Sequence, residues 1–550
     1  MRSRTLTEYL RPAAKGLRSG TTRRQLLQGG GVLAAGCVLP AAAFGAAASP
    51  QRQVPSKSVY EALGVRPLIN ARGTVTIVGA TRILPEVKAA MDGASREFVQ
   101  LDELMEGVSR QLAALTGAEW GIVTSGASAA LSVATAACIA GGDPDKLAQL
   151  PDLTGLKDEV IMPRYSRTAY DHAVKAVGVR VVEVDSREEL EAALGPRTAL
   201  VMVLAGRGSN EGPLSLPVIA ALAAPRGVPI LVDAAADELV VPNPYLASGA
   251  DLVAYSGGKC LRGPQCAGLL LGRRDLVQAA WINSAPHHGF GRGFKVGREE
   301  IMGMLAAVEA WRHTRNHVEE QRTWTSWLEH IAARLTSVRG VSTEIVQPQG
   351  SSNRTPSIRV QWDPAVIPLT GDEVEKLLWD GDPRIAVGGA GSFLPFPPST
   401  EPNIRIVPYQ LEAGEERVIA ERVHALLGSP PRKTARTDPP AADVSGQWDV
   451  NVTFVSGSAK HTFAIEQKSS SLVGTHHARF AARDLGGTLH GRDLLLRSSY
   501  TLEGVRLNYT FTGVVDGNTM HGTVLLGEYG TAEWKAVRRV YRPPGAPRRG

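Results

Sequence analysis

Short apolar runs alternate with stretches of helical spacing over residues 58–300. Runs such as 159–163, 199–204 and 228–232 are each long enough for one strand and lack the polar alternation of a half-exposed strand. Segments rich in small and amphipathic residues separate them, as crossover helices would. This order predicts an α/β domain with a wound, mostly parallel sheet.

The pattern changes after residue 300. A long helical pattern at 299–335 predicts a connecting helix, and the residues that follow it, to 428, predict a small α/β subdomain; together they make up the region 301–428. Residues 429–443 contain Ser-Pro-Pro and Asp-Pro-Pro, which are typical of a linker. From 444 to 541, apolar and polar positions alternate in short runs, and Asp516-Gly517 predicts a hairpin turn. The last part therefore predicts a separate antiparallel β-barrel or sandwich of lipocalin-like type.

The first 48 residues have the pattern of an export signal. Arg23-Arg24 precedes a weakly apolar run at 30–39 and small residues through Ala48. That run is too short to span a bilayer. We expect twin-arginine export to the periplasm or the exterior and no stable membrane span. A lipid-anchored form through Cys37 is less favoured, because the residues before it match a lipobox poorly.

The positive charge of the chain lies in the same segment. Residues 1–48 hold seven Lys or Arg and one acid, and since the chain has a net charge of +6, the remainder holds 53 basic and 53 acidic residues. Nucleic-acid binding depends on basic side chains that contact phosphates. We therefore expect no nucleic-acid partner after processing. The basic, proline-rich residues 542–550 are expected to be disordered.

A single lysine lies in the turn between two apolar runs, at 252–255 and 267–271. Lys259 follows Tyr-Ser-Gly-Gly and precedes a Gly-Pro turn, which predicts strand, loop and strand. A desolvated lysine amine forms a Schiff base readily with an aldehyde cofactor. The alternative is an ordinary lysine on an exposed loop, and this window alone does not separate the two.

Asp233 is the second candidate of this kind, because it ends the apolar run 228–232. A carboxylate at the carboxyl end of a buried parallel strand points into the crevice where α/β proteins bind ligands. In pyridoxal phosphate (PLP) enzymes such a carboxylate pairs with the ring nitrogen of the cofactor. Alone, Asp233 could be a structural acid.

A third predicted strand ends at a candidate anion-binding site. Residues 119–124 lead into Ser125, Gly126, Ala127 and Ser128 and then into an alanine-rich helix. Their hydroxyl and backbone N–H groups, together with the helix dipole, suit a phosphate. A Ser-Gly turn alone is commonly just a helix cap. The order phosphate turn, aspartate, lysine predicts a fold type I PLP enzyme.

Several motifs resemble the bacterial selenocysteine synthase (L-seryl-tRNA(Sec) selenium transferase) family, and especially its tRNA-independent relatives such as the D-glucosaminate-6-phosphate ammonia-lyases. The resemblance covers residues 58 to about 428. It implies that Lys259 is the Schiff-base lysine, that Asp233 faces the ring nitrogen, and that Ser256 adds to the cofactor site. The motifs are residues 67–76, 124–130, 231–236, 255–259 and 291–300.

A side chain that stacks on the cofactor ring is expected after the strand at 159–163. Tyr170 is the candidate, with His172 as the alternative, and either could instead be structural. The family often carries a histidine where this chain has Ser166-Arg167, which puts the local chemistry in doubt.

The glycine-rich segment 283–295 offers groups for the substrate. Arg292 and Lys295 could hold anionic groups, and His287 or its neighbour His288 could transfer protons. Related enzymes build sites across subunit interfaces, so we expect a homo-oligomer. The alternative is a mobile surface loop.

In the small subdomain, Arg405 is the candidate fork for a substrate carboxylate and Arg384 its competitor. Either could equally make a surface ion pair.

No metal site is predicted. The β-domain histidines His476, His477 and His490 are expected to be solvent-facing strand residues rather than ligands. Cys260 and Cys266 flank the lysine, and plain packing is favoured over a disulfide.

The residues and the resemblance together predict an exported PLP-dependent lyase or transferase acting on an amino acid or amino-sugar acid. Loss of a β-substituent, in an ammonia-lyase reaction, is favoured, and transamination or racemisation stays open. Lys259 is the expected α-proton base. Activity on seryl-tRNA is disfavoured by the neutral processed chain, and an inactive binding or scaffold protein is disfavoured by the retained Lys259 and Asp233.

Overall fold

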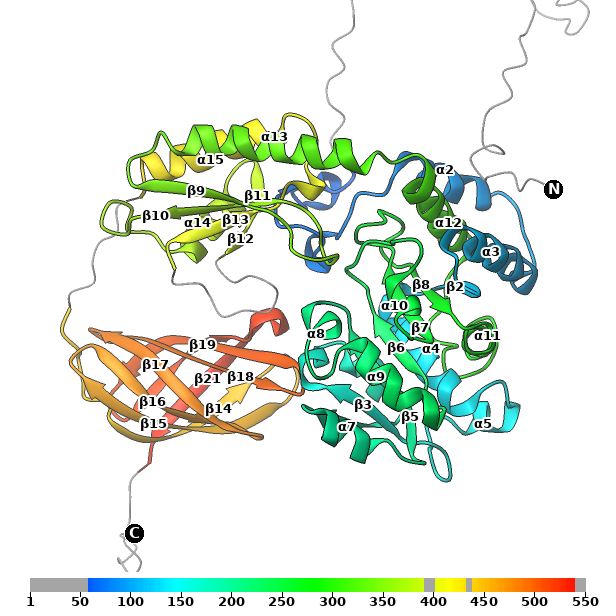
Figure 1. Cartoon of the computed structure of the whole chain (residues 1–550). Coiled ribbons are helices and arrows are strands. Elements are labelled where there is room, and N and C mark those ends of the chain that lie inside the picture. The colour runs from blue at the N-terminus through cyan, green and yellow to red at the C-terminus, as the bar shows by residue number, and fades with distance from the viewer. Residues whose placement is uncertain (1–57, 390–400, 432–437, 540–550) are drawn as a thin grey trace, which may run out of the picture. The chain divides into compact units, whose positions relative to one another are not determined.

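The computed structural model describes residues 58–389, 401–431 and 438–539 (Figure 1). The predicted export signal and the predicted tail lie outside these residues, as does part of the linker. Residues 58–67 belong to a first unit, whose described part contains the short turn η1 (Glu61–Leu63); the described residues from Leu68 onward belong to a second. Within the described ranges, no helix is both long and apolar enough to cross a bilayer.

A seven-stranded sheet is the centre of the large domain, with strand order β2-β8-β7-β6-β5-β3-β4. The strands from β7 to β4 run parallel, and β8 is antiparallel to both of its neighbours. Six of the seven residues of β5 are buried, because helices cover both faces of a parallel sheet. The strands are β2 (Trp120–Thr124), β3 (Glu159–Pro163), β4 (Arg180–Val184), β5 (Thr198–Leu204), β6 (Ile230–Asp233), β7 (Leu252–Ser256) and β8 (Gly268–Gly272).

Helix α4 (Gly126–Ala140) packs on β2 and on β5 to β8. Seven of its fifteen residues are alanine, and these small side chains let the helix approach the sheet closely. The other helices of this domain are α2 (Pro85–Ala94), α3 (Leu101–Thr116), α5 (Pro144–Gln149), α6 (Asp171–Lys175), α7 (Arg187–Ala193), α8 (Arg207–Asn210), α9 (Leu216–Ala223), α10 (Pro244–Ala247) and α11 (Arg274–Ile282), with short 3-10 turns η2 (Thr76–Val78), η3 (Arg164–Ser166) and η4 (Ala224–Arg226).

The connecting helix predicted at 299–335 is two helices, α12 (Arg298–His313) and α13 (His317–Leu335). Asn316 begins the second one, because its side-chain oxygen accepts a hydrogen bond from the backbone N–H of Glu319 at 3.1 Å. An Asn followed three residues later by Glu is a helix-start signal. The uninterrupted helix was therefore a wrong prediction.

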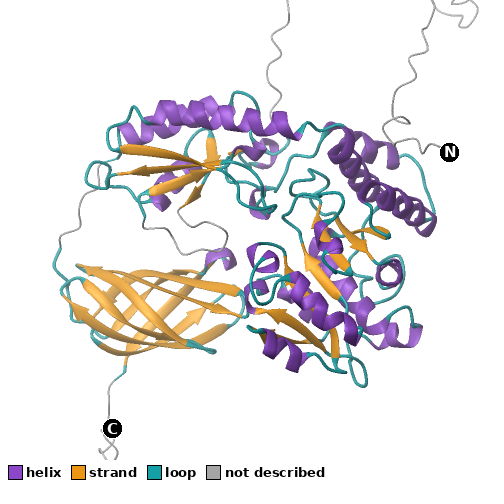
Figure 2. Cartoon of the chain, viewed as in Figure 1, coloured by secondary structure: helices purple, strands orange, loops and turns teal. Residues whose placement is uncertain are grey.

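The small subdomain is a four-stranded antiparallel sheet, in the order β12-β13-β10-β9, with helices α13, α14 and α15 (Figure 2). Ile358, Ile404 and Ile406 lie in its core with Leu328 and Ile331 of α13. The elements are β9 (Val341–Val346), β10 (Ser357–Trp362), β12 (Gly388–Gly389), β13 (Asn403–Ile406), α14 (Gly371–Asp380), η5 (Pro408–Gln410) and α15 (Glu415–Gly428), and β1 (Leu68–Asn70) pairs in parallel with β11 (Arg384–Ala386).

The predicted β-domain is a closed antiparallel barrel of eight strands, which β14 closes by pairing with β21. The Asp516-Gly517 hairpin is confirmed, with Asp516 opposite Thr519. The strands are β14 (Gly446–Thr453), β15 (Ser458–Lys468), β16 (Ser471–His477), β17 (Ala482–His490), β18 (Asp493–Leu502), β19 (Val505–Asp516), β20 (Thr519–Leu525) and β21 (Thr531–Arg538), with the turn η6 (Gly527–Tyr529) after β20.

The prediction of solvent-facing histidines in this barrel is wrong for His476. Side chains alternate along β16, so His477 faces outward while His476 is fully buried. Its ring nitrogens lie 2.9 Å from Nδ1 of His461 and 2.7 Å from Oγ of Ser498. In the described part of the chain, no three His, Cys, Asp or Glu side chains are grouped to bind a metal ion.

Acidification is expected to destabilise the barrel. Burial lowers the pKa of His461 to about 4 and that of His476 to about 2, and the charge of Arg483 acts in the same direction. An unfolded histidine titrates near 6.5, so the unfolded chain binds more protons below that pH. The contribution of these histidines to the free energy of unfolding of the barrel is therefore fully present above about pH 6.5, and it is lost as the pH decreases towards 4.

Thermal unfolding of the full chain between pH 7 and pH 4 measures this effect. The melting temperature of the barrel transition should fall steeply with pH in the wild type and less steeply in His476→Gln, which removes one of the two buried histidines. A melting temperature with the same pH dependence in both proteins contradicts the assignment.

Candidate active site

The carboxyl ends of three parallel strands bring the predicted cofactor residues to one edge of the sheet. Strand β6 ends at Asp233, β7 ends at Ser256 just before the lysine loop, and β2 ends at Thr124 just before α4. Gly268 of β8 pairs with both Thr124 and Ser256. Since neighbouring strands lie about 4.8 Å apart, β2 and β7 are about 10 Å apart at this edge. The register therefore confirms that the three predicted pieces converge.

The lysine loop leaves β7 in a conformation that requires glycine. A Cβ atom on Gly257 would lie 2.7 Å from Sδ of Met304 and 2.8 Å from the backbone oxygen of Ala267. Two backbone hydrogen bonds close the loop, both at 2.8 Å. The N–H of Gly257 donates to the carbonyl oxygen of Ala267, and the N–H of Gly263 donates to the carbonyl oxygen of Gly257. Lys259 is thus held on a fixed backbone at the strand end.

The side chains of Lys259 and Asp233 interact electrostatically. Burial lowers the pKa of the Lys259 amine, and the charge of Asp233 opposes that shift. Asp233 is 4% exposed, and burial raises the pKa of its carboxyl group. A hydrogen bond from the N–H of Ala235, at 3.0 Å, and the charge of Lys259 act in the opposite direction and lower that pKa. In the described part of the chain, the Lys259 amine has no ion pair within 4.0 Å. It is a desolvated amine opposite a buried acid.

The start of α4 fits a phosphate group. Ser125 occupies the cap position, but its side chain makes no capping hydrogen bond, so the first N–H groups of the helix have no side-chain acceptor there. Ser128 is exposed. A Cβ atom on Gly268 would lie 2.5 Å from the carbonyl carbon of Gly126 and 2.6 Å from the nitrogen of Ala127, so only glycine lets β8 pass beneath this turn. An anion here would meet backbone N–H groups at a helix N-terminus.

Tyr170 lies within electrostatic reach of Asp233. The tyrosine is at the start of α6, with its side chain half-exposed. Partial burial raises the pKa of its hydroxyl, and the charge of Asp233 adds to that shift. The candidate for ring stacking is therefore on the predicted edge of the sheet. The helix that follows it, α6, spans only Asp171–Lys175.

His287 has a different environment from the one that a proton-transfer role needs. Its Nε2 lies 3.1 Å from the carboxylate of Asp102, and its Nδ1 lies 3.0 Å from the backbone oxygen of Trp281. Trp281 also donates to Asp102, at 2.9 Å. Both ring nitrogens are engaged, which favours a structural role for His287. Arg292 and Lys295 lie in the same segment with exposed side chains.

Arg405 has a polar partner outside the cofactor edge. Its Nε donates to Oγ of Ser357 at 2.9 Å, and it is opposite Arg359 in the β10–β13 pair. Burial lowers its pKa, and the charge of Arg359 adds to that effect. In the described residues, no hydrogen bond or ion pair joins Arg405 to the lysine loop, so its role as a carboxylate fork stays a prediction.

Arg262 and Tyr409 are two residues of the site that the sequence did not point to. Arg262 lies in the lysine loop with φ at +53°, and its N–H donates to the carbonyl oxygen of Lys259 at 3.0 Å. Burial lowers the pKa of its guanidinium group, whereas the nearby Tyr409 opposes that shift. The Tyr409 hydroxyl donates to the carbonyl oxygen of Cys260 at 2.7 Å. An arginine three residues after the lysine was the available signal for an anion-binding group.

The two cysteines beside the lysine are free, as expected. Cys260 donates to the backbone oxygen of Asp237 at 2.8 Å, and burial raises its pKa to about 12. Cys266 is exposed. Neither has the lowered pKa of a reactive thiol.

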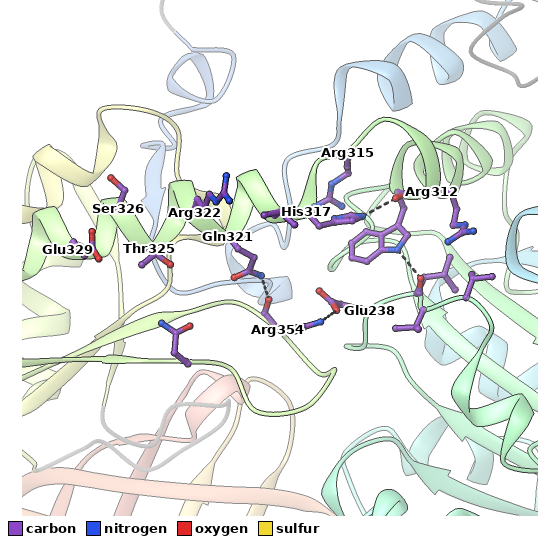
Figure 3. A pocket seen from close by; sticks show the side chains of 16 residues that line it. Glu238, Arg312, Arg315, His317, Gln321, Arg322, Thr325, Ser326, Glu329 and Arg354 are labelled. Atoms are coloured by element: carbon purple, nitrogen blue, oxygen red, sulfur yellow. Dashed lines mark hydrogen bonds and ion pairs between the residues drawn. The ribbon is translucent and has the colours of Figure 1, made fainter.

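A pocket of ≈ 860 Å³ lies behind the lysine loop, but it is not the cofactor seat (Figure 3). Its lining includes Arg315, whose Nη1 donates to the carbonyl oxygen of Cys260 at 2.6 Å, yet neither Lys259 nor Asp233 lines it. Arg315 is also paired with Glu320, at 2.8 Å. The ion pair between Arg354 and Glu238, at 3.0 Å, crosses the pocket from another loop. The hydrogen bond from Arg315 therefore joins the wall of this pocket to the lysine loop.

Comparisons with known proteins decide the family. The model of the DegT/DnrJ/EryC1/StrS aminotransferase family matches residues 81–237. D-glucosaminate-6-phosphate ammonia lyase from Salmonella typhimurium is 33% identical over 59% of this chain and 88% of its own length. This chain belongs to the D-glucosaminate-6-phosphate ammonia-lyase family. The family members are fold type I PLP-dependent enzymes, and so is this chain. The predicted fold class, cofactor and resemblance are confirmed.

Other members and relatives differ in the reactions for which they are named. 5'-C-glycyluridine monooxygenase-decarboxylase from a Streptomyces species is 32% identical over 52% of this chain and 73% of its own. L-seryl-tRNA(Sec) selenium transferase from Rhizobium meliloti is 30% identical over 45% of this chain and 56% of its own length. The structure of D-glucosaminate-6-phosphate ammonia-lyase superposes with a TM-score of 0.59 and 29% identity, covering 68% of this chain and 99% of that one. The family is thus shared by enzymes that transform different substrates.

Proposed function

We propose that this chain is a PLP-dependent ammonia-lyase that acts on an amino-sugar acid or a related β-substituted amino acid. The observation that carries the proposal is the pair of Lys259 and Asp233 at neighbouring strand ends, in a chain 33% identical to a protein named as a D-glucosaminate-6-phosphate ammonia lyase. Bound PLP supplies an electron sink that acidifies the α C–H of an amine substrate.

Different residues of this chain would bind the phosphate, the ring nitrogen and the ring face of the cofactor. The backbone N–H groups of Gly126 and Ala127, with the hydroxyls of Ser125, Ser128 and Ser256, would hold the phosphate. Asp233 would face the ring nitrogen, where its negative charge favours the protonated ring, and Tyr170 would lie against the ring.

Lys259 would hold the cofactor aldehyde and afterwards move the α proton of the substrate at its Nζ atom. Burial suits both tasks, because the lowered pKa leaves a larger fraction of the amine neutral at a given pH. Arg262, half-buried in the same loop, would bind an anionic group of the substrate. Arg292, Lys295, His287 and Arg405 remain candidates for contacts with substrate in an assembled oligomer.

Ammonia release tests the reaction type. The purified full chain, loaded with PLP, should release ammonia and a keto acid from one or more members of a panel of sugar-acid phosphates and D-amino acids, with D-glucosaminate 6-phosphate as the first substrate. Release of neither product from any member, by protein that holds PLP, contradicts the lyase proposal.

The 32% identical monooxygenase-decarboxylase supports a second candidate reaction. Here O₂ would oxidise an amino-acid substrate to an amide shortened by one carbon: one oxygen atom enters the amide, the other leaves as water, and the carboxyl group leaves as CO₂. The same panel, followed for O₂ consumption and CO₂ release, separates the two: elimination proceeds without oxygen, whereas the oxidative reaction stops under argon.

We also propose that the chain is exported by the twin-arginine route and acts as a homo-oligomer. The Arg23-Arg24 signal supports the first statement, and the exposed segment with Arg292 and Lys295 supports the second. Replacement of both Arg23 and Arg24 by lysine should retain the protein in the cytoplasm of its host, and light scattering of the processed enzyme should give a mass of at least two chains.

A further inference from the structure

The interior of the β-barrel is apolar at one end and contains a cluster of polar side chains towards the other. Near the connections 469–470, 491–492 and 517–518 it is filled by large apolar side chains such as Trp448, Phe463 and Met520. The opposite end carries the connections 454–457, 478–481, 503–504 and 526–530. Near that end, apolar inward residues such as Val452, Val524 and Ala532 lie beside a group of polar ones: His461, His476, Arg483, Ser498, Tyr500 and Tyr509.

Arg483 is a buried cation that forms no ion pair with any described residue. It is 6% exposed, and its Nη2 donates to the backbone oxygen of Ala481 at 3.0 Å. Its Nε and Nη1 have no hydrogen-bond partner in the described part of the chain. Every Asp and Glu within the eight strands is at an exposed position. A buried charge costs folding free energy unless an opposite charge or hydrogen-bond acceptors compensate it.

The side chains around Arg483 are neutral: the rings and hydroxyls of two tyrosines, and two imidazoles. Its guanidinium carbon lies 3.4 Å from the ring centroid of Tyr500 and 5.5 Å from that of Tyr509. His476 is directly opposite Arg483 in the β16–β17 pair and hydrogen-bonds His461. Burial and the charge of Arg483 keep both histidines neutral near pH 7. The cluster therefore carries one positive charge.

A pocket of ≈ 460 Å³ opens at this end of the barrel. Its lining is mainly apolar and includes Phe454, Val455, Leu507 and Leu526. Tyr509 belongs to both the pocket and the cluster, since its ring centroid lies 5.1 Å from that of His476. The volume is within the usual range for small-molecule sites, about 300–1,000 Å³. An eight-stranded barrel has room for one small ligand.

We propose that the barrel binds a small monocarboxylate with an apolar body, whose carboxylate contacts Arg483 beside Tyr509 while the body occupies the pocket lined by Phe454, Leu507 and Leu526. One guanidinium group balances one negative charge, and the free N–H groups of Arg483 are the donors that a carboxylate requires. A phosphate dianion would leave a net negative charge buried among neutral groups. The barrel would thus be a ligand-binding module, separate in chemistry from the PLP site.

Titration calorimetry on the full-length PLP-loaded protein tests this proposal with four probes of equal chain length: octanoate, 1-octanol, octylamine and octyl phosphate. Octanoate should bind the wild type at least tenfold more tightly than the other three. Arg483→Gln should weaken octanoate at least tenfold, whereas the matched control Arg497→Gln, at an exposed position of β18, should leave its affinity unchanged.

The melting temperature of each variant keeps the result interpretable. Arg483→Gln removes a buried, unbalanced charge, so its barrel should melt no lower than the wild type in the absence of octanoate. The proposal is overturned if octanoate does not bind the wild type at millimolar concentration, if 1-octanol or octyl phosphate binds as tightly, or if folded Arg483→Gln retains the wild-type affinity. Equal binding of octyl phosphate would make the site one for anions in general, and each of the other outcomes would assign Arg483 to the packing of the barrel alone.

Discussion

Replacement of Lys259 by alanine is expected to lower turnover by at least about 10³-fold and to abolish the visible absorbance of protein-bound PLP. The amine is desolvated, and in the described structure it has no ion pair within 4.0 Å, so alanine removes a reactive group rather than a structural contact. Loss of a proton-transfer group alone costs about 10²–10⁴-fold. Steady-state ammonia release and an absorbance scan measure the two effects.

Two comparisons make the Lys259 result specific. Lys146→Ala, which removes an exposed lysine 3.6 Å from Asp143, should retain both turnover and absorbance. Lys259→Arg keeps a positive charge but cannot bond the aldehyde, and it should be as inactive as the alanine variant. Turnover within tenfold of wild type in either Lys259 variant means that another group performs the chemistry.

Replacement of Asp233 by asparagine is expected to separate function from stability. The change removes the negative charge that would face the ring nitrogen, and removal of one electrostatic stabiliser in an active site typically costs about 10²–10³-fold in kcat. Burial raises the pKa of Asp233, so in the absence of cofactor its charged form is disfavoured in the folded state. The cofactor-free Asp233→Asn protein should therefore melt no lower than the wild type at pH 7.

The Asp233→Asn variant should still take up PLP on Lys259, because the phosphate seat at the start of α4 is unchanged. Asp233→Glu, which retains the charge, should be the more active of the two variants. If Asp233→Asn turns over substrate like the wild type, the acid does not act on the ring. If it melts far below the wild type without cofactor, Asp233 is a structural acid.

The parts of the site that the sequence predicted are those fixed by strand ends. Asp233, Lys259 and the Ser125–Ser128 turn each follow a buried apolar run, and the register of a parallel sheet then leaves little choice of position. The barrel was predicted on the same basis, because strict alternation over short runs has few other solutions. The wound parallel sheet of the large domain and the presence of a small α/β subdomain were predicted from the order of the strand and helix patterns along the chain.

The features that the sequence does not indicate are side chains whose direction depends on contacts distant in sequence. His287 faces Asp102, 185 residues earlier, and no local pattern indicates that contact. His476 and His477 are adjacent and chemically identical, so only the strand register decides which one is buried. Nε of Arg262 donates to the carbonyl oxygen of Arg82, 180 residues earlier in the chain, so no local pattern indicates where this side chain lies. The break between α12 and α13, by contrast, had a local signal in Asn316 and Glu319.

Lys259 is expected to be the residue to which PLP is attached. Borohydride reduction of the PLP-loaded protein, followed by proteolysis and peptide mass spectrometry, tests it most directly. The predicted result is a phosphopyridoxyl group on the peptide that contains Lys259 and on no other lysine peptide. A stoichiometric label on a different lysine, or protein that takes up no label when saturated with PLP, would contradict the account.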